Sequence, residues 1–381
     1  MTMIDFKLFR FAPILIAVSM AAPVLSDSQT LRTEYQAIVL EKIAGDLEHP
    51  WAIDFLPDGR MLVTERPGRL NIIDEQGNVE RVEGTPEVAA QRQGGLMEVL
   101  LHPRFEDNGS VYMTYSKDDG SGQTATALAR GRLENSAIVD LEDLYVQERF
   151  SDPGRHYGSK LAWMPDGTLL MSIGDRGSEP PRAQALDDSA GTLIRLTEDG
   201  GIPDNNPFVG RDDVLPEIYT YGNRNIQGLV VHPETGAVWT TEHGPRGGDE
   251  LNFMQPGGNY GWPVVSKGRD YRTGEQFGDS VRSRPDMIDP VIDWTPSIAA
   301  SGLALLVDDH FPAWQGNLLA GGLRSEQIRR VVFEDGVPVH EEELIRGEIG
   351  RIRDVRVGPD GNIYVVTDHS DGGLYRISPA N

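Results

Sequence analysis

FLPDGRMLVT, at residues 55–64, is the stretch that decides the fold. It places a Pro-Asp-Gly turn between two short apolar segments. Proline fixes the φ angle of the first turn position, and aspartate and glycine tolerate the conformations that follow it. Strand-forming residues on both sides of such a turn predict a β-hairpin.

The same pattern recurs along the chain. Close copies are LHPRFEDNGSVYMT (101–114), WMPDGTLLMS (163–172), VHPETGAVWT (231–240) and VGPDGNIYVVT (357–367), and a diverged copy runs through residues 307–321. A hairpin of this size cannot bury its own apolar face, so repeated copies must stack. About six copies in a mostly β chain predict an all-β, six-bladed β-propeller. The alternative is a β-sandwich with coincidental turns.

The composition excludes several classes of partner. Of 381 residues, 35 are Lys or Arg and 59 are Asp or Glu, which gives a formal charge of −24. Such a chain repels phosphate backbones and anionic lipid surfaces, so nucleic acid is not expected as a partner. The acidity could help to hold a divalent cation, although a solvated acidic surface is its commoner meaning. The chain has no cysteine, so no disulfide is available.

The N-terminus has the features of a secretory signal. Lys7 and Arg10 precede an apolar run over residues 11–22, and small residues lead to a cleavage position before Asp27. We therefore expect a signal peptide at residues 1–26, a single mature domain at 27–381, and a periplasmic or secreted protein. The run is short for a membrane span, so no stable membrane insertion is expected after cleavage. An uncleaved signal anchor is the alternative.

His156 is the candidate general base. Glycines at positions 154 and 158 leave room for a ligand beside it, and imidazole titrates close to working pH. Most other histidines precede a turn proline or lie in polar loops without a motif. A hydrogen-bonded loop histidine is the alternative interpretation.

Polar side chains also recur next to strand starts in other copies of the repeat. They are Gln93, Arg224, Asn225, Gln227, Arg324, Arg351 and Arg353. In so acidic a chain, recurring arginines need a reason, and planar guanidinium groups bind carboxylates in bidentate fashion. A polycarboxylate ligand in the central channel is therefore expected. For any single arginine, a structural ion pair is the alternative.

The donor atoms favour calcium as the metal. There is no cysteine and no closely spaced histidine pair, which argues against zinc. Oxygen donors favour calcium. The carbonyls of Gly244 and Pro245 form one candidate site, and Glu250 with the Tyr260 carbonyl forms another. The Gly-x-Gly-x-x-Gly and Gly-x-Ser-x-Gly motifs are absent, which excludes a dinucleotide fold and a serine hydrolase elbow.

Six motifs make the chain similar to a known family. They are QGGL (93–96), GNRNIQGL (222–229), EHGP (242–245), GDELN (248–252), NYGWP (259–263) and RIRD (351–354). The chain resembles the soluble, pyrroloquinoline-quinone (PQQ)-dependent aldose sugar dehydrogenases of the glucose/sorbosone dehydrogenase family. The likeness extends over nearly the whole mature chain, from His49 to Arg376.

The resemblance implies a reaction and a role for each candidate residue. An aldose is oxidised at the anomeric carbon to the lactone, His156 takes the hydroxyl proton, and hydride passes to PQQ. The quinone is held by Arg224, Asn225, Arg324, Arg351 and Arg353, with Gln93, Gln227 and Ser297 nearby. Calcium on the Gly244 and Pro245 carbonyls polarises the quinone, and Glu250 with the Tyr260 carbonyl holds a structural calcium. The electron acceptor is not identified by sequence.

Two parts of the sequence bear on which sugar is bound, and the first of them also departs from the family pattern. Arg155, Tyr157 and Lys160 are unusual neighbours of the histidine, and we expect them where the sugar binds. The polar segments 174–218 and 266–293 are expected to shape the sugar pocket. The alternatives are a non-catalytic sugar- or protein-binding propeller and a calcium-dependent lactonase.

Overall fold

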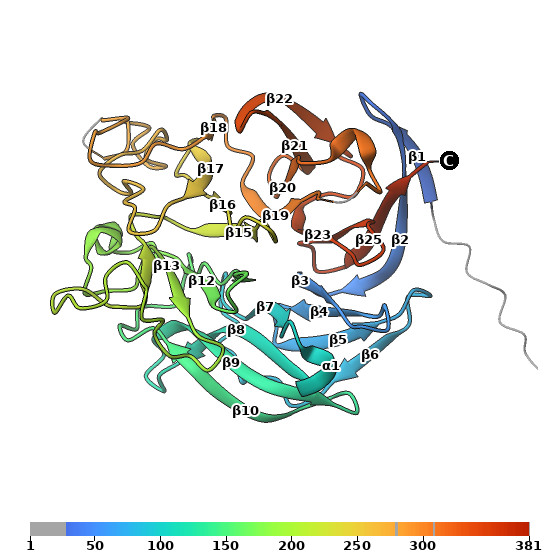
Figure 1. Cartoon of the computed structure of the whole chain (residues 1–381), viewed down its shortest axis with the longest axis horizontal. Coiled ribbons are helices and arrows are strands. Elements are labelled where there is room, and N and C mark those ends of the chain that lie inside the picture. The colour runs from blue at the N-terminus through green and yellow to red at the C-terminus, as the bar shows by residue number, and fades with distance from the viewer. Residues whose placement is uncertain (1–27, 279–280, 308, 381) are drawn as a thin grey trace, which may run out of the picture.

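Six β-sheets are arranged in a ring about a central axis (Figure 1). The computed structural model describes residues 28–278, 281–307 and 309–380, so the predicted signal peptide lies outside the described residues. The predicted six-bladed β-propeller is confirmed, and the alternative β-sandwich is wrong.

Each blade is antiparallel, and its first strand lies nearest the axis. Blade 1 consists of β3 (Pro50–Phe55), β4 (Met61–Glu65), β5 (Arg69–Ile73) and β6 (Val79–Val82). Blade 2 consists of β7 (Leu96–Leu101), β8 (Ser110–Asp118), β9 (Thr124–Glu134) and β10 (Ala137–Val146). Blade 3 consists of β11 (Leu161–Trp163), β12 (Leu169–Ile173), β13 (Thr192–Leu196) and β14 (Ile218–Thr220). Blade 4 consists of β15 (Ile226–Val231), β16 (Val238–Glu242), β17 (Asp249–Met254) and β18 (Ile292–Trp294). Blade 5 consists of β19 (Ala300–Leu305), β20 (Leu318–Gly322), β21 (Gln327–Glu334) and β22 (Val337–Leu344).

Blade 6 joins the two ends of the chain. It consists of β23 (Ile352–Val357), β24 (Ile363–Thr367), β25 (Gly372–Pro379), β2 (Ala37–Leu47) and β1 (Ser28–Arg32). Strand β2 pairs with β25, which closes the ring (Figure 1). Three short helical turns are α1 (Phe105–Asn108), η1 (Pro180–Gln184) and η2 (Pro312–Trp314). Within the described ranges, no helix is long and apolar enough to cross a membrane.

Every copy of the repeat lies between the first and second strands of a blade. In the copy at residues 55–64, Leu56 N–H donates to the Arg60 carbonyl at 2.8 Å. In the copy at residues 163–172, Met164 N–H donates to the Thr168 carbonyl at the same distance. In the longer copies, α1 and η2 occupy the turn. We call this end of the ring the turn end and the opposite one the site end.

The core lies between blades rather than within them. Six clusters of buried apolar side chains each join two adjacent blades, and together they connect the whole ring. Leu62 of blade 1 and Met113 of blade 2, for example, share one cluster and are fully buried. This agrees with the expectation that no hairpin buries its own face.

The two long polar segments do not both lie where the sequence suggested. Residues 174–191 follow β12 at the site end, and Leu215 N–H donates to the Leu186 carbonyl at 2.8 Å, but residues 197–206 lie at the turn end. There the Glu198 carboxylate lies 2.7 Å from His102 in the blade 2 turn. Glu198 follows β13, whose Arg195 donates to Thr168 in the blade 3 turn. The expectation that the whole of 174–218 shapes the site is therefore wrong for residues 197–206, because β13 returns the chain to the opposite end.

Candidate active site

A central cavity of about 240 Å³ opens at the site end and is lined by residues from all six blades. In chain order they are Trp51, Arg66, Gln93, Met97, Tyr157, Gly158, Asn225, Gln227, His243, Ala299, Leu323, Arg351, Arg353 and Asp368. Five of the predicted residues are among them. The sequence prediction that polar residues at strand starts of different blades converge is confirmed for these five.

His156 lies beside this cavity with its backbone held in the left-handed region, at φ 59°. A Cβ atom on Gly174 would lie 2.1 Å from the His156 carbonyl oxygen, so a glycine is required there. The His156 N–H donates to Gln93 Oε1 at 2.9 Å, and its Nδ1 lies 2.6 Å from Asp175 Oδ1. Trp262 Nε1 donates to the other Asp175 oxygen at 2.7 Å. The imidazole is thus fixed by Asp175, which Trp262 holds in turn, while Gln93 holds the His156 backbone.

The protonation states of this pair follow from burial and charge. Burial raises the pKa of Asp175, but hydrogen bonds from His156 and Trp262 and the charge of Arg224 outweigh burial and hold it below its ordinary value. Burial and the Arg224 charge lower the pKa of His156 to about 4, although Asp175 opposes the shift. At neutral pH the carboxylate is ionised and the imidazole is neutral. Nδ1 therefore carries the proton and donates it to Asp175, which leaves Nε2 as an acceptor.

Arg353 and Gln227 form the floor of the polar lining. Arg353 donates to Asp368 Oδ2 at 2.7 Å and to Gln227 Oε1 at 3.1 Å. Gln227 Nε2 donates to the Gly158 carbonyl at 2.9 Å, and Asn225 Oδ1 accepts from the Gly158 N–H at 3.1 Å. The segment after His156 is therefore tied to the start of β15.

Arg351 and Arg353 point to the same side, as their alternate spacing predicts. Both guanidinium groups reach Asp368, Arg351 at 3.4 Å. Burial raises the pKa of Asp368, but the charge and hydrogen bond of Arg353 and the contact with His49 outweigh it, so the carboxylate is ionised.

Three buried nitrogen atoms around the site have no hydrogen-bond partner in the part of the chain that the structure describes. They are Nε of Arg224, Nε of Arg353 and Nε2 of His243. Arg224 is otherwise well held, because it donates to the His243 carbonyl at 2.9 Å and lies 5.2 Å from the Trp262 ring centroid. Leaving polar nitrogens buried without partners costs free energy. A ligand rich in oxygen acceptors would satisfy the two arginine nitrogens, which are both donors.

A second, much smaller cavity lies next to Arg224, with a volume of about 10 Å³. Its oxygen-bearing lining includes Glu242, Gly244, Pro245, Glu250 and Tyr260. The space is about that of one water molecule or one ion. The sequence prediction divided four of these residues between two calcium sites, Gly244 with Pro245 and Glu250 with Tyr260, and the structure brings all four together around one small cavity.

Glu242 is the residue that the prediction left out of this group. Asn252 Nδ2 donates to Glu242 Oε1 at 3.2 Å and to Glu250 Oε2 at 3.1 Å, so the two carboxylates lie side by side. Burial and the charge of Glu242 raise the pKa of Glu250 well above its ordinary value. Two adjacent buried carboxylates suit a hard cation.

The other donors at this place are backbone carbonyls. Across residues 28–278, 281–307 and 309–380, no group of three or more His, Asp or Glu side chains could hold a metal ion. The Pro245 carbonyl accepts a hydrogen bond of 3.0 Å from the hydroxyl of Tyr271, whose side chain is largely exposed. Tyr271 belongs to the predicted segment 266–293, so this part of that segment does lie at the site end.

Four of the residues predicted for the base and the quinone do not line the central cavity: His156 lies beside it, Arg224 lines the smaller cavity, and Ser297 and Arg324 line neither. Ser297 Oγ donates to Asp249 Oδ2 at 2.6 Å, and Asp249 also accepts from the Gly244 N–H at 3.0 Å. Ser297 therefore supports the turn at Gly244. Arg324 is exposed, and its side chain has no partner among the described residues. It follows Leu323, which does line the cavity.

The expectation that Lys160 lies where the sugar binds is wrong. Its Nζ is buried 2.7 Å from Asp354 Oδ1 and 3.0 Å from Glu98 Oε2. Arg356 pairs with the same two carboxylates. Lys160 lies at the edge of an inner strand, so its side chain enters the channel interior instead of the mouth. Of its companions, Tyr157 lines the cavity and Arg155 is exposed.

Sequence reasoning missed several residues of the site. Trp51, Arg66 and Asp368 line the cavity, Asp175 holds His156, and His49 Nδ1 lies 2.8 Å from Asp368 Oδ1. Most of them could have been found from their position in the sequence. They lie a few residues before or after a copy of the repeat, where the chain is at the site end.

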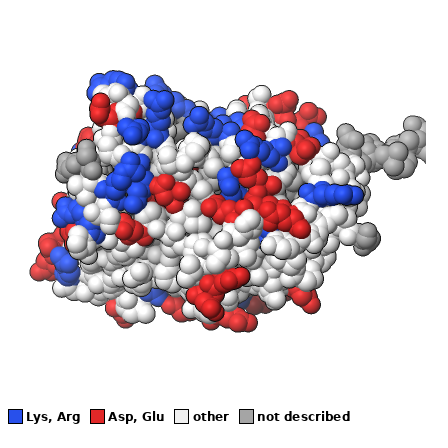
Figure 2. Space-filling model, turned by 90° about the horizontal axis from the view of Figure 1, so that it is seen from above, with Lys and Arg blue, Asp and Glu red and all other residues white. Residues whose placement is uncertain are grey.

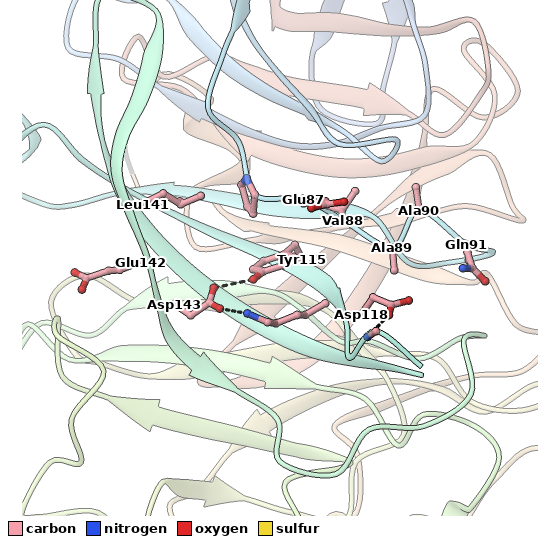
Figure 3. A pocket seen from close by; sticks show the side chains of 13 residues that line it. Glu87, Val88, Ala89, Ala90, Gln91, Tyr115, Asp118, Leu141, Glu142 and Asp143 are labelled. Carbon is pink, nitrogen blue, oxygen red and sulfur yellow. Dashed lines mark hydrogen bonds and ion pairs between the residues drawn. The ribbon is translucent and has the colours of Figure 1, made fainter. Parts of the chain in front are cut away.

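A larger cavity of about 740 Å³ lies elsewhere, between the connection 86–91 and strands β8 and β10 of blade 2 (Figure 3). Acidic side chains line it, including Glu87, Asp118 and Glu142. Its charged centre is already paired, because Asp143 accepts from the Tyr115 hydroxyl at 2.7 Å and contacts Lys117. None of the residues lining this outer cavity is among the predicted site residues.

Comparison with known proteins decides the family. A sequence model of the glucose/sorbosone dehydrogenases matches residues 47–376. The chain belongs to the glucose/sorbosone dehydrogenase family. The resemblance predicted from the six motifs is confirmed.

Members of the family match over nearly their whole length. Aldose sugar dehydrogenase YliI of Escherichia coli is 39% identical over 367 residues, which cover 94% of this chain and 98% of that protein. The crystal structure of the E. coli aldose sugar dehydrogenase in its apo form matches with a TM-score of 0.85 at 37% identity, over 90% of this chain and 100% of that one.

Two more distant members are named for their cofactor. Quinoprotein glucose dehydrogenase B of Acinetobacter calcoaceticus is 26% identical, over 93% of this chain and 90% of that protein. The PQQ-bound aldose sugar dehydrogenase of Streptomyces coelicolor has a TM-score of 0.74 at 24% identity, over 94% of this chain and 100% of that one, and this likeness shows the fold alone.

Proposed function

We propose that this protein oxidises aldose sugars at the anomeric carbon to the lactone, with PQQ as hydride acceptor and Ca²⁺ as its partner ion. The observation that carries the proposal is the set of unpartnered buried nitrogens on Arg224, Arg353 and His243 around a cavity beside His156. Relatives named aldose sugar dehydrogenase and quinoprotein glucose dehydrogenase support it. An exported enzyme, as residues 1–26 predict, remains part of the proposal.

The lining fits a flat, polycarboxylated quinone. Arg353 and Arg224 would bind its carboxylates and carbonyls, and Asn225, Gln227 and Gln93 offer amide groups at the same cavity. Arg351 and the exposed Arg324 would close over it from the mouth. When bound, PQQ supplies a two-electron acceptor and Ca²⁺ polarises one of its carbonyls.

The ligands of the structural calcium would come from the smaller cavity. The Gly244 and Pro245 carbonyls face PQQ in this proposal, so the Tyr271 hydroxyl would turn away from Pro245 when an ion binds there. Glu250 and the Tyr260 carbonyl would hold the structural ion, and we add Glu242 to that set because it lies against Glu250. A cation there removes the repulsion between the two carboxylates.

His156 takes the proton in the proposed reaction. Its Nε2 accepts the proton of the anomeric hydroxyl as the carbon loses hydride, and the resulting imidazolium is stabilised by the ionised Asp175. Asp175 also fixes the ring orientation, and Trp262 fixes Asp175. The three residues come from three separate loops at the site end.

Titration of the metal-free protein with PQQ and Ca²⁺, followed by addition of an aldose, tests the proposal. We expect saturable binding by absorbance and then reduction of the bound quinone by the sugar, with lactone as product. Failure to bind PQQ would favour a non-catalytic propeller. Hydrolysis of a lactone that needs calcium but not PQQ would favour the lactonase alternative.

Arg353 gives a direct prediction for cofactor affinity. Arg353→Met should weaken PQQ binding about 10–100-fold, because a charge-assisted hydrogen bond contributes about 1.5–3 kcal/mol. Arg329→Met on the outer strand β21 is the control, since Arg329 also pairs with a glutamate, at 3.0 Å. The measurement is a PQQ titration of both variants. Equal affinities would contradict the placement of the quinone over Arg353.

Calcium should stabilise the fold through the paired carboxylates. At a calcium concentration 100 times the dissociation constant, we expect about 2.7 kcal/mol of stabilisation, read as a higher denaturation midpoint than in EDTA. Glu250→Gln should remove most of this gain, whereas Glu87→Gln in the outer cavity should retain it. A full calcium effect in the Glu250 variant would mean that the ion binds elsewhere.

A further inference from the structure

Exposed arginines without a carboxylate partner gather at the site end. We call them the arginine rim, and within the described chain none of them takes part in an ion pair. The rim consists of Arg92, Arg155, Arg246, Arg269, Arg272 and Arg324. Exposed arginines elsewhere are commonly paired, as Arg132 is with Asp140 at 2.6 Å and Arg104 with Glu198 at 3.4 Å.

The rim surrounds the mouth of the central cavity. Arg92 precedes Gln93, Arg155 precedes His156, and Arg324 follows Leu323, so three rim residues are chain neighbours of site residues.

On the blade 4 side, Arg246 follows the Pro245 turn, and its backbone exchanges hydrogen bonds of 2.9 and 3.0 Å with Arg269. In side view, Lys and Arg are most frequent along one edge of the molecule, where some acidic residues also lie, and most acidic residues lie below it (Figure 2). Carboxylates such as Asp152 and Glu348 also lie at the site end. The arginines of the rim are therefore separate cations with acidic residues between them, not one continuous basic patch.

The central channel is closed on its other side. Below the cavity, Lys160 lies 4.5 Å from the centroid of the Trp51 ring. Glu98, Asp354 and Arg356 fill the space around Lys160, and the side chains of Lys160, Glu98 and Asp354 are at most 2% exposed. This buried cluster lies between the cavity and the turn end, and the cavity opens at the site end, where the rim lies.

We infer that the arginine rim docks an electron-carrier protein with an acidic face, which takes electrons from the reduced enzyme. The inference rests on the proposed function. Each aldose that becomes a lactone leaves two electrons and two protons with the enzyme and its cofactor. Two one-electron carriers remove one electron each, and the two protons pass to water.

Charge and extent favour this partner. A neutral sugar gains nothing from unpaired guanidinium groups, whereas carboxylates bind them in bidentate fashion. The rim draws on loops from several blades, which is wider than a small anion requires. The chain as a whole has a charge of −24, but at about 0.1 M salt the Debye length is about 10 Å, so the local cations decide the contact.

A single cytochrome in two charge states tests the inference. The probes are a small basic cytochrome c and the same cytochrome after succinylation of its lysines, each used to oxidise the PQQ- and calcium-loaded enzyme in the presence of an aldose. At about 0.1 M salt we expect the succinylated form to be reduced faster, with the advantage lost at about 1 M salt. Stopped-flow absorbance of the haem measures both rates.

Charge reversal on the rim should weaken only the acidic probe. Arg246→Glu with Arg272→Glu should slow reduction of succinylated cytochrome about tenfold, since steering by local charge changes association rates by 10-fold or more. Arg32→Glu with Arg81→Glu is the matched control, because both are exposed, unpaired in the described part of the chain and on outer strands. It should change the rate less than twofold.

The outcomes separate this inference from the proposed function. Suppose that sugar still reduces the bound quinone, but the two cytochromes are reduced at equal rates or the two double variants have equal effects. The proposed function then holds, and the inferred docking surface is wrong. If sugar does not reduce the loaded enzyme at all, the proposed function fails and the inference fails with it.

Discussion

Replacing His156 with glutamine should lower the rate at which an aldose reduces the loaded enzyme by about 10²–10⁴-fold, the usual contribution of a general base. Glutamine keeps a polar side chain of similar reach but cannot accept the hydroxyl proton. PQQ binding should be nearly unchanged, because His156 contacts Asp175 and Gln93 and does not line the central cavity. Single-turnover absorbance gives the rate, and titration gives the affinity.

The pH profile adds a second test of the same residue. His156 must be neutral to accept a proton, and its pKa is lowered to about 4. The rate should therefore stay constant as pH falls from 7 and drop only near pH 4, not near the ordinary imidazole value of about 6.5. His232→Gln at the turn end is the control and should leave the profile unchanged. An acid limb near pH 6.5 would contradict the effect of burial and Arg224.

Replacing Lys160 with methionine should destabilise the fold by about 3–5 kcal/mol. The change leaves Glu98 and Asp354 buried with Arg356 as their remaining cation, and an uncompensated buried charge is costly. Equilibrium denaturation in urea measures the loss.

The matched control is Lys117→Met, which breaks a lysine–carboxylate pair at Asp143 in the outer cavity. That pair is partly exposed, so its loss should cost about 0–1 kcal/mol. Equal effects of the two substitutions would show that the buried cluster contributes no more to stability than a surface contact. Calcium should be kept constant in both titrations, because it also stabilises the fold.

The fold could be predicted because its signal is local. Each Pro-Asp-Gly copy specifies a hairpin within about a dozen residues, and the number of copies indicated the number of blades. Residues 197–206 of segment 174–218 were misplaced because sequence does not show which end of the ring a loop after a third strand reaches. Each strand carries the chain from one end of the ring to the other, so the end that a loop reaches depends on how many strands of the blade precede it. Strand β13 is the third, and it returns the chain to the turn end.

The candidate site could be predicted where side chains flank a strand start. Gln93, Asn225, Gln227, Arg351 and Arg353 do line the cavity. Acidic partners were missed because their contacts join distant parts of the chain. His49 and Asp368 are 319 residues apart and meet only when the ring closes, and Asp175 meets Trp262 across 87 residues. No spacing rule in the sequence encodes such pairs.

Pairing of β2 with β25 also constrains the order of assembly. Residues 37–47 are among the first of the described chain to be synthesised, yet beyond the neighbouring β1 their partner strand lies at residues 372–379. The ring therefore cannot close on a ribosome-bound chain before its last strand has emerged, and the earlier blades must wait as an open arc with one unpaired edge. Completion of the site is delayed in the same way, because Arg351, Arg353 and Asp368 belong to that last blade. A nascent or truncated chain is consequently unable to form the cavity.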